Sequence, residues 1–164
     1  MSSALPKVTV ALLTRNRPAL LRLALQSVLA QRGVELSVIV LDNASADDTP
    51  DVARAFAAAD ARVAYVRHES DIGIVRNWNR GIELACARSP LVSIFHDDDV
   101  MLPGFLAESA RALQAHPTAG MSLCLAQYMP LTARLSLSVP PLVKITSDGR
   151  APSIAATSSR DSST

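Results

Sequence analysis

Three neighbouring aspartates, Asp97, Asp98 and Asp99, follow His96 and a short apolar segment at 91–95. Two carboxylates about 5 Å apart repel each other by roughly 3 kcal/mol at an effective dielectric constant near 20, so the cluster requires a compensating cation. Mg²⁺ and Mn²⁺ prefer oxygen ligands and commonly bind through one or two carboxylates together with substrate phosphates. The cluster therefore indicates metal-assisted phosphate chemistry. A solvated turn that caps the next helix is the alternative.

The elements that position this cluster can be predicted from the apolar pattern. Short apolar segments rich in β-branched residues predict buried strands, and apolar residues at helical spacing predict helices between them. This alternation is typical of the α/β class, with an open, mostly parallel sheet and helices on both faces. The predicted strands are 8–13, 36–41, 63–66 and 91–95, with a further one at 121–128; the predicted helices begin at Pro18, at Pro50 with Thr49 as its N-cap, at Val75 and at Pro103.

Polar clusters occupy the segments that follow the strands, at 14–17, 42–48, 71–79 and 96–99. In an open α/β sheet, ligands bind outside the carboxyl ends of the strands. Because all four clusters follow parallel strands, we expect them to converge on one cleft.

Several classes of function are disfavoured. A net charge of +1 without a basic block argues against a nucleic-acid partner. Neither of the familiar glycine-rich nucleotide motifs follows the first strand, which argues against NAD-binding and P-loop proteins. A receiver-type phosphoacceptor domain needs an acidic pair after the first strand, where this chain has Thr14, Arg15, Asn16 and Arg17.

Composition bounds the organisation of the chain. A length of 164 residues with 49% hydrophobic content predicts one globular domain, which we place at 1–129, followed by a Pro- and Ser-rich tail at 130–164 that we expect to be disordered or truncated. The start has no signal-peptide pattern, and no apolar run is long enough for a transmembrane segment. Cys86 and Cys124 are predicted to be small buried residues of a reducing compartment. We therefore expect a cytoplasmic protein, or one peripheral at the membrane.

Four motifs in order resemble the family 2 glycosyltransferases. They are the segment 8–18 with 27–31, the segment 38–45 with Asp48 and Thr49, the segment 73–77, and the segment 96–103. The resemblance covers roughly 7–128. It implies the GT-A fold, a Rossmann-like sheet, and transfer of a sugar from a nucleotide-diphosphate sugar to an acceptor hydroxyl. Inversion at the sugar and a Mn²⁺ or Mg²⁺ cofactor are also implied.

The resemblance assigns roles to residues of the first two loops. Asp42 stands where the family's aspartate contacts the nucleotide base, with an Asx-turn as the alternative. Thr14 and Asn16 match positions that line the base and ribose. A structural role at the start of the helix is an equal alternative for Asn16.

The acidic run matches the family's Asp-x-Asp motif when counted back from Pro103. His96 then replaces the first aspartate, Asp98 is the metal ligand, and Asp97 reaches the ribose or a metal-bound water. Neighbouring side chains on a strand point to opposite faces, so these carboxylates share one ion only if the backbone turns. Asp99 is expected to support the loop.

Arg76 and Asn77 match the family's Arg-Asn pair near the nucleotide, and Arg76 would neutralise a phosphate or a carboxylate. A solvated helix arginine is the alternative. Trp78 and His68 receive no role.

The general base of an inverting transfer is not identifiable. No Asp or Glu lies between Glu108 and Asp148, although the family supplies this carboxylate from the second half of its domain. Two functions therefore stay open: a hexosyltransferase-like enzyme acting on a saccharide or lipid-linked acceptor, or an inactive module that binds nucleotide diphosphate and metal without transfer.

Overall fold

Strands and helices alternate along residues 5–124, the part of the chain that this computed structural model describes. The strands are β1 (Lys7–Thr14), β2 (Glu35–Asp42), β3 (Val63–Arg67) and β4 (Leu91–His96), and the helices are α1 (Pro18–Leu29), α2 (Thr49–Ala59), α3 (Ile74–Cys86) and α4 (Phe105–Ala115). These elements confirm the sequence prediction, with shifts only at their ends.

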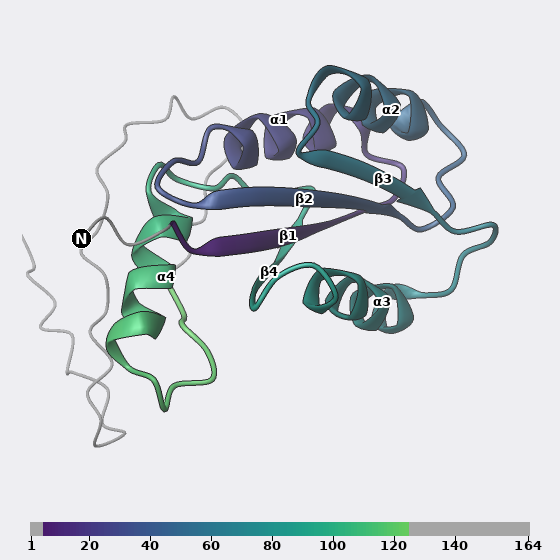
Figure 1. Ribbon diagram of the computed structural model, residues 1–164. Helices are drawn as coiled ribbons and strands as arrows, with labels where there is room; N and C mark the ends of the chain where they lie inside the picture. Colours follow the sequence, from purple (N-terminus) through teal and green to yellow (C-terminus); the bar gives the residue numbers. More distant parts are fainter. Residues whose placement is uncertain (1–4, 125–164) are drawn as a thin grey trace, which may run out of the picture. The chain divides into compact units, whose positions relative to one another are not determined.

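The sheet is parallel throughout, in the order β3-β2-β1-β4. The chain first moves outward from β1 through β2 to β3 and then returns to the other side of β1 as β4. Right-handed crossovers place helices on opposite faces when the direction of progress reverses in this way. Figure 1 shows this arrangement, with α1 and α2 on one face of the sheet and α3 on the other. The predicted open sheet with helices on both faces is confirmed.

The larger core lies between the sheet and α1, α2 and α4. Alternate residues of β1 and β2 enter it, and the residues between them face α3, so both strands are buried on both sides. This double burial explains why their sequences are continuous apolar runs rather than alternating ones. The fully buried members of the larger core include Val10, Leu12, Leu21, Leu25, Val28, Val38 and Val40.

Gly81 sets the close approach of α3 to β1. A Cβ atom at this position would lie 3.0 Å from Leu13 Cδ2 and 3.4 Å from Ala11 Cβ. We expect Gly81→Val to lower the free energy of unfolding by about 1–3 kcal/mol, because added methyl groups overpack a closed interface.

Chemical denaturation of Gly81→Val measures this effect. The control is Asn79→Val on the exposed side of the same helix, whose intrinsic helix propensity changes little. Equal losses in the two variants would mean that the packing against Leu13 does not limit this position.

Three details differ from the sequence predictions. Thr49 is the first residue of α2, and Asp48 is its N-cap. Residues 121–124 have no strand conformation, and the rest of the strand predicted at 121–128 lies outside the described residues, as does the tail at 130–164. The prediction that both cysteines are buried is wrong, because Cys86 and Cys124 are exposed free thiols.

Among residues 5–124, no helix combines the length and apolar character that crossing a membrane requires.

Candidate functional site

The carboxyl ends of the four strands lie level at one edge of the sheet. Thr14 pairs with Asp42, Asp42 pairs with Arg67, and Leu13 pairs with His96 at the end of β4. The direction of the chain across the sheet reverses between β1 and β4. A reversal of this kind leaves a crevice outside the strand ends, where ligands of α/β proteins bind.

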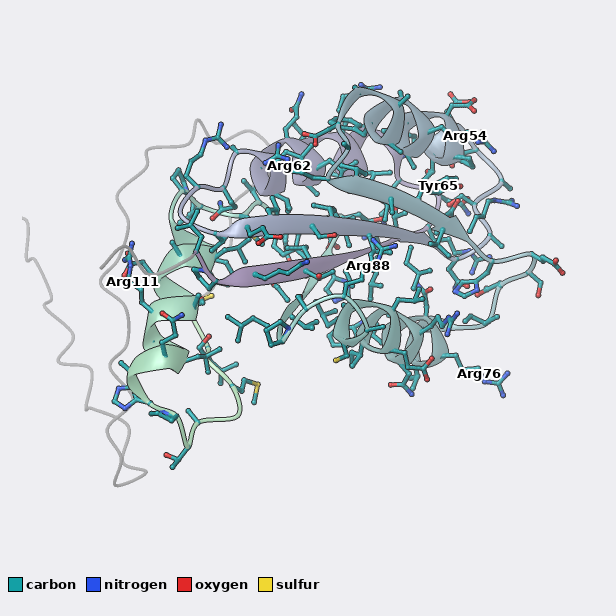
Figure 2. The ribbon with its side chains drawn as sticks, viewed as in Figure 1. Arg54, Arg62, Tyr65, Arg76, Arg88 and Arg111 are labelled. Atoms are coloured by element: carbon teal, nitrogen blue, oxygen red, sulfur yellow. The ribbon has the colours of Figure 1, made fainter. Side chains whose placement is uncertain are left out.

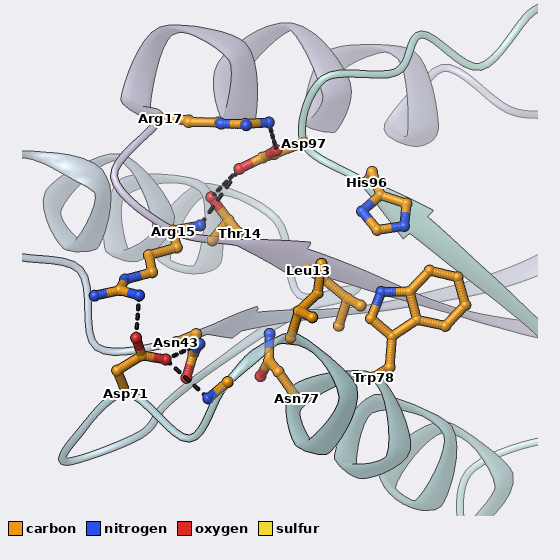
Figure 3. Close-up of a pocket in the computed structure, with 12 residues that line it drawn as sticks. Leu13, Thr14, Arg15, Arg17, Asn43, Asp71, Asn77, Trp78, His96 and Asp97 are labelled. Carbon is orange, nitrogen blue, oxygen red and sulfur yellow. Dashed lines mark hydrogen bonds and ion pairs between the residues drawn. The ribbon is translucent and has the colours of Figure 1, made fainter.

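A cavity of about 410 Å³ opens at this edge, as predicted from the polar clusters (Figure 3). It brings together Thr14, Asn77 and Asp97, which are three of the predicted site residues. The complete lining is Leu13, Thr14, Arg15, Arg17, Asn43, Asp71, Gly73, Ile74, Asn77, Trp78, His96 and Asp97.

Asp97 is the central carboxylate of this edge and is only 5% exposed. Its Oδ2 accepts a hydrogen bond from Thr14 Oγ1 at 2.8 Å and a longer one from the Arg15 amide at 3.4 Å. Since a buried carboxylate is stabilised by such donors, Thr14 fixes the end of β4 against the end of β1. Asp97 thus has a structural role that the sequence did not indicate.

Arg17 joins Asp97 to Asp98. Its Nη1 lies 3.2 Å from Asp97 Oδ1 and 2.7 Å from Asp98 Oδ2. The hydrogen bond to Asp98, followed by the charge of Asp97, raises the pKa of Arg17, which keeps the guanidinium charged. β4 ends at His96 and the chain turns at Asp97 and Asp98, so the backbone turn that the strand alternation required is present. Both carboxylates can therefore face one cation.

A second hydrogen-bonded group lines the same cavity around Asp71. Its Oδ1 accepts from the Gly73 amide at 2.9 Å and from Asn43 Nδ2 at 2.6 Å, and its Oδ2 pairs with the Arg15 side chain. The Gly73 amide, with Asn43 and Arg15, lowers the pKa of Asp71. This carboxylate is therefore ionised at neutral pH, and it holds Arg15 at the cavity wall.

Asn77 is buried at 5% exposure near the start of α3. Its Oδ1 lies 3.1 Å from His68 Nε2, and its Nδ2 donates to no protein group within residues 5–124. The amide donor is thus available to a ligand in the cavity. Asn77 lines the cavity, and the binding role predicted for it stays a prediction.

Asp42 does not line the cavity, in contrast to its predicted contact with a nucleotide base. The side chain is 0% exposed. Its Oδ1 accepts from the Ser45 amide at 2.9 Å and from Ser45 Oγ at 2.5 Å, and its Oδ2 accepts from Tyr65 Oη at 2.7 Å, with Arg67 Nε at 3.5 Å. The carboxylate is saturated by protein donors from Ser45, three residues on, and from two residues of β3. Its role is structural, but the backbone bond is one residue longer than in the Asx-turn given as the alternative. Burial, together with Asp42, raises the pKa of Tyr65.

Asn16 also lies outside the cavity lining. It adopts a left-handed backbone conformation with φ of 53°, which asparagine tolerates. Its amide donates to Ser45 Oγ at 2.9 Å, and its Oδ1 accepts from the Ala46 amide at 2.8 Å. Asn16 therefore links the loop after β1 to the loop after β2. This role is structural, but it differs from the helix-start role given as the alternative, because Arg17 is the N-cap of α1.

Arg76 is exposed on α3, and its side chain extends outward from the helix (Figure 2). It is not among the residues that line the cavity. Consecutive residues of an α-helix are about 100° apart, so the inward position of Asn77 turns Arg76 outward. The structure does not bring Arg76 to the phosphate or carboxylate that it was predicted to neutralise.

Trp78 was given no role, and His96 was assigned to the position of the family's first aspartate. Both line the cavity. Their ring centroids are 4.9 Å apart at an interplanar angle of 46°. Trp78 is 37% exposed. Together with Ile74 and Val75 it also lines a second, shallow and mainly apolar hollow. The sequence signal for Trp78 was its place one residue after Asn77 near the start of a helix, but helical spacing alone did not distinguish it from a packing residue.

The site combines two kinds of binding chemistry. The cavity lining carries the cationic side chains of Arg15 and Arg17 and an amide donor from Asn77, which suit anionic and polar groups of a ligand. The second kind of binding chemistry comes from Asp97 and Asp98, whose two carboxylates share one positive charge, the guanidinium of Arg17. This donor set fits a hard divalent cation that also uses ligand phosphates. Within residues 5–124, no cluster of three or more His, Cys, Asp or Glu side chains is placed to hold a metal without such a ligand.

Solved structures with the same fold are known. A solved mannosyltransferase from Pyrobaculum calidifontis, in complex with GDP-Man and Mn²⁺, superposes with a TM-score of 0.67 at 27% identity, covering 77% of this chain and 37% of that chain. S. aureus TarS, solved with UDP-GlcNAc, shares the fold with a TM-score of 0.60 at 21% identity over 68% of this chain and 32% of that chain. These structures confirm the GT-A fold predicted from the sequence.

Sequence relatives point to the same family. The Campylobacter jejuni GalNAc(5)-diNAcBac-PP-undecaprenol beta-1,3-glucosyltransferase is 34% identical over 63% of this chain and 33% of its own length. The Rhizobium meliloti succinoglycan biosynthesis protein ExoU is 32% identical over 66% of this chain and 31% of its own length. The chain thus spans about a third of the length of these relatives. The model of Glycosyl transferase family 2 matches residues 9–141, more than half of the sequence, and the chain therefore belongs to the family 2 glycosyltransferases.

Proposed function

We propose that the chain binds a nucleotide-diphosphate sugar in the cavity between β1 and β4, and that the protein transfers the sugar to an acceptor hydroxyl with inversion and with the help of a divalent cation. The observation that carries this proposal is the pair Asp97 and Asp98, whose carboxylates share one cationic partner at the edge of the cavity. The family membership supports the donor class.

The residues of the cavity divide the binding work. Asp98 is the principal ligand for Mn²⁺ or Mg²⁺ and Asp97 supports it, because Asp97 is also held by Thr14. The bound cation would supply Lewis-acid stabilisation of the departing nucleotide diphosphate. Asn77 donates to the nucleotide, and Thr14 keeps the two strand ends in register.

No residue of this chain is assigned as the general base of the transfer or as a ligand of the acceptor. The interval between Glu108 and Asp148 contains no carboxylate to serve as base, which favours the second candidate, a module that binds the donor without transfer. The C. jejuni relative carries an undecaprenol-linked saccharide in its name, so a saccharide or lipid-linked acceptor is proposed. We place the protein in the cytoplasm, or at the membrane surface where a lipid-linked acceptor is presented.

Thermal unfolding with a panel of nucleotide diphosphates tests the binding proposal. We expect at least one of UDP, GDP, ADP and dTDP to raise Tm, and Mn²⁺ to increase that shift. A ligand at one hundred times its Kd stabilises the folded state by about 2.7 kcal/mol. The absence of any shift, with the diphosphates or their sugar conjugates and with either metal, would contradict the proposal.

A second assay separates the enzyme from the binding module. The matching nucleotide sugar is incubated with Mn²⁺ and a mixture of saccharide acceptors, and release of the nucleotide diphosphate is measured. Release above the rate without protein identifies the enzyme. Binding without release identifies the module.

A further inference from the structure

Arg17 occupies a position between the two carboxylates to which the proposed function assigns the cation. One guanidinium nitrogen, Nη1, contacts both Asp97 Oδ1 and Asp98 Oδ2, at 3.2 Å and 2.7 Å. A divalent cation needs lone pairs of the same oxygens. Since two positive charges cannot share these oxygens without strong repulsion, the guanidinium and the cation compete.

The structure allows Arg17 to leave without disturbing the fold. Its backbone is fixed, because its amide donates to Thr49 Oγ1 at 3.0 Å and its carbonyl accepts from the Leu21 amide at 2.9 Å in the first turn of α1. Its side chain is 47% exposed and ends in the cavity rather than in the core. The side chain can therefore rotate while the main chain stays in place.

The released guanidinium has an evident new partner. Arg15 and Arg17 are the cationic side chains in the cavity lining, and Arg15 is already paired with Asp71. A diphosphate bound together with a cation held by Asp97 and Asp98 would come close to the Arg17 side chain. The planar guanidinium fork of Arg17 matches phosphate oxygens within the same cavity.

We infer that Arg17 is an exchangeable counter-ion: it neutralises Asp97 and Asp98 in the free protein, leaves them when the divalent cation binds, and then binds the diphosphate of the donor. This inference rests on the proposed function. It makes Arg17 a binding residue with opposite effects on the two ligands. It weakens binding of the metal alone, and it strengthens binding of the metal with the diphosphate.

The first measurement is the affinity for Mn²⁺ alone, followed by electron paramagnetic resonance of the free ion. Arg17→Gln is expected to bind Mn²⁺ about fivefold more tightly than the unchanged protein, because the competing charge is gone. Arg15→Gln is the matched control. It removes the same charge from the lining of the same cavity but leaves Asp97 and Asp98 paired with Arg17, so its Mn²⁺ affinity is expected to change less than about twofold.

The second measurement is the affinity for UDP and GDP at saturating Mn²⁺, by calorimetry. Arg17→Gln is expected to weaken the better of these two ligands about tenfold, as loss of a charge-assisted hydrogen bond does. Arg17→Lys keeps the charge without the fork and is expected to fall between the unchanged protein and Arg17→Gln in both measurements. A merely structural role of Arg17 would not produce effects of opposite sign.

The outcomes separate this inference from the proposed function. If Arg17→Gln binds Mn²⁺ with equal or lower affinity while the unchanged protein binds Mn²⁺ with UDP or GDP, the exchange is refuted and the proposed function stands. If Arg17→Gln binds Mn²⁺ more tightly but keeps full diphosphate affinity, the second half of the exchange is refuted. If the unchanged protein binds neither Mn²⁺ nor any of UDP, GDP, ADP and dTDP, both proposals fail.

Discussion

Asp98→Asn is expected to abolish the gain in nucleotide-diphosphate affinity that Mn²⁺ provides. Asparagine keeps the size of the side chain but removes the anionic oxygen, and hard divalent cations depend on that charge. The side chain of Asp98 is 51% exposed and its one protein partner in the described structure is Arg17, so the substitution spares the core. We expect the nucleotide affinity measured in Mn²⁺ to fall at least about tenfold, to the value measured in EDTA.

Asp99→Asn provides the matched control for this result. Asp99 follows Asp98 and is exposed. Its backbone amide donates a hydrogen bond to the His96 carbonyl. The variant carries the same change in charge within the same turn. We expect it to keep the full effect of Mn²⁺. Loss of the metal effect in Asp99→Asn with retention in Asp98→Asn would move the ion to a different carboxylate.

Asp42→Ala is expected to lower the free energy of unfolding by about 2–4 kcal/mol, because loss of a fully buried acceptor leaves its donors unpaired. The substitution removes an acceptor that receives hydrogen bonds from Ser45 and Tyr65 and lies 3.5 Å from Arg67 Nε. The buried donors of Ser45 and the partly buried hydroxyl of Tyr65 are then left without their partner. Denaturant unfolding followed by circular dichroism measures the loss.

Asp51→Ala is the control for Asp42→Ala. Asp51 forms an ion pair with Arg54 on the surface of α2, and its side chain is 77% exposed. Its removal is expected to cost less than about 0.5 kcal/mol. If Asp42→Ala were as stable as this control and lost nucleotide affinity instead, Asp42 would be a binding residue rather than the structural anchor seen here.

The sequence predicted the elements and the edge of the sheet at which the site lies. Strands such as β1 and β2 are continuous apolar runs because both of their faces are covered, and this pattern is local in sequence. The polar residues directly after them could then be assigned to one crevice. Thr14 and Asp97 were correctly placed in this crevice for that reason.

The contacts within the site could not be predicted in the same way. The saturation of Asp42 depends on Tyr65 and Arg67, which belong to a different strand and become its neighbours only in the folded sheet. The orientation of Arg76 depends on the rotation of α3 about its axis. Gly81 fixes that rotation through its close approach to Leu13. Neither the contacts of Asp42 nor the rotation of α3 can be predicted from the spacing of residues along the sequence.

Arg17 shows the same limit. It lies in a polar cluster that was predicted to border the crevice, but its pairing with Asp97 and Asp98 joins segments far apart in the chain. Only the parallel pairing of β1 with β4 brings these segments together. The sequence predicted that the acidic cluster needs a cation from solution. The protein itself also supplies a cationic partner, the guanidinium of Arg17.

Paramagnetic broadening by Mn²⁺ in the amide NMR spectrum tests the central claim most directly. With the nucleotide diphosphate that gives the largest thermal shift, we expect Mn²⁺ to broaden first the amides of Thr14, Arg15, Asp97, Asp98 and Asp99, and Mg²⁺ in its place to leave them sharp. Paramagnetic broadening centred on another part of the chain, or no selective broadening at all, would contradict a donor site at the ends of β1 and β4.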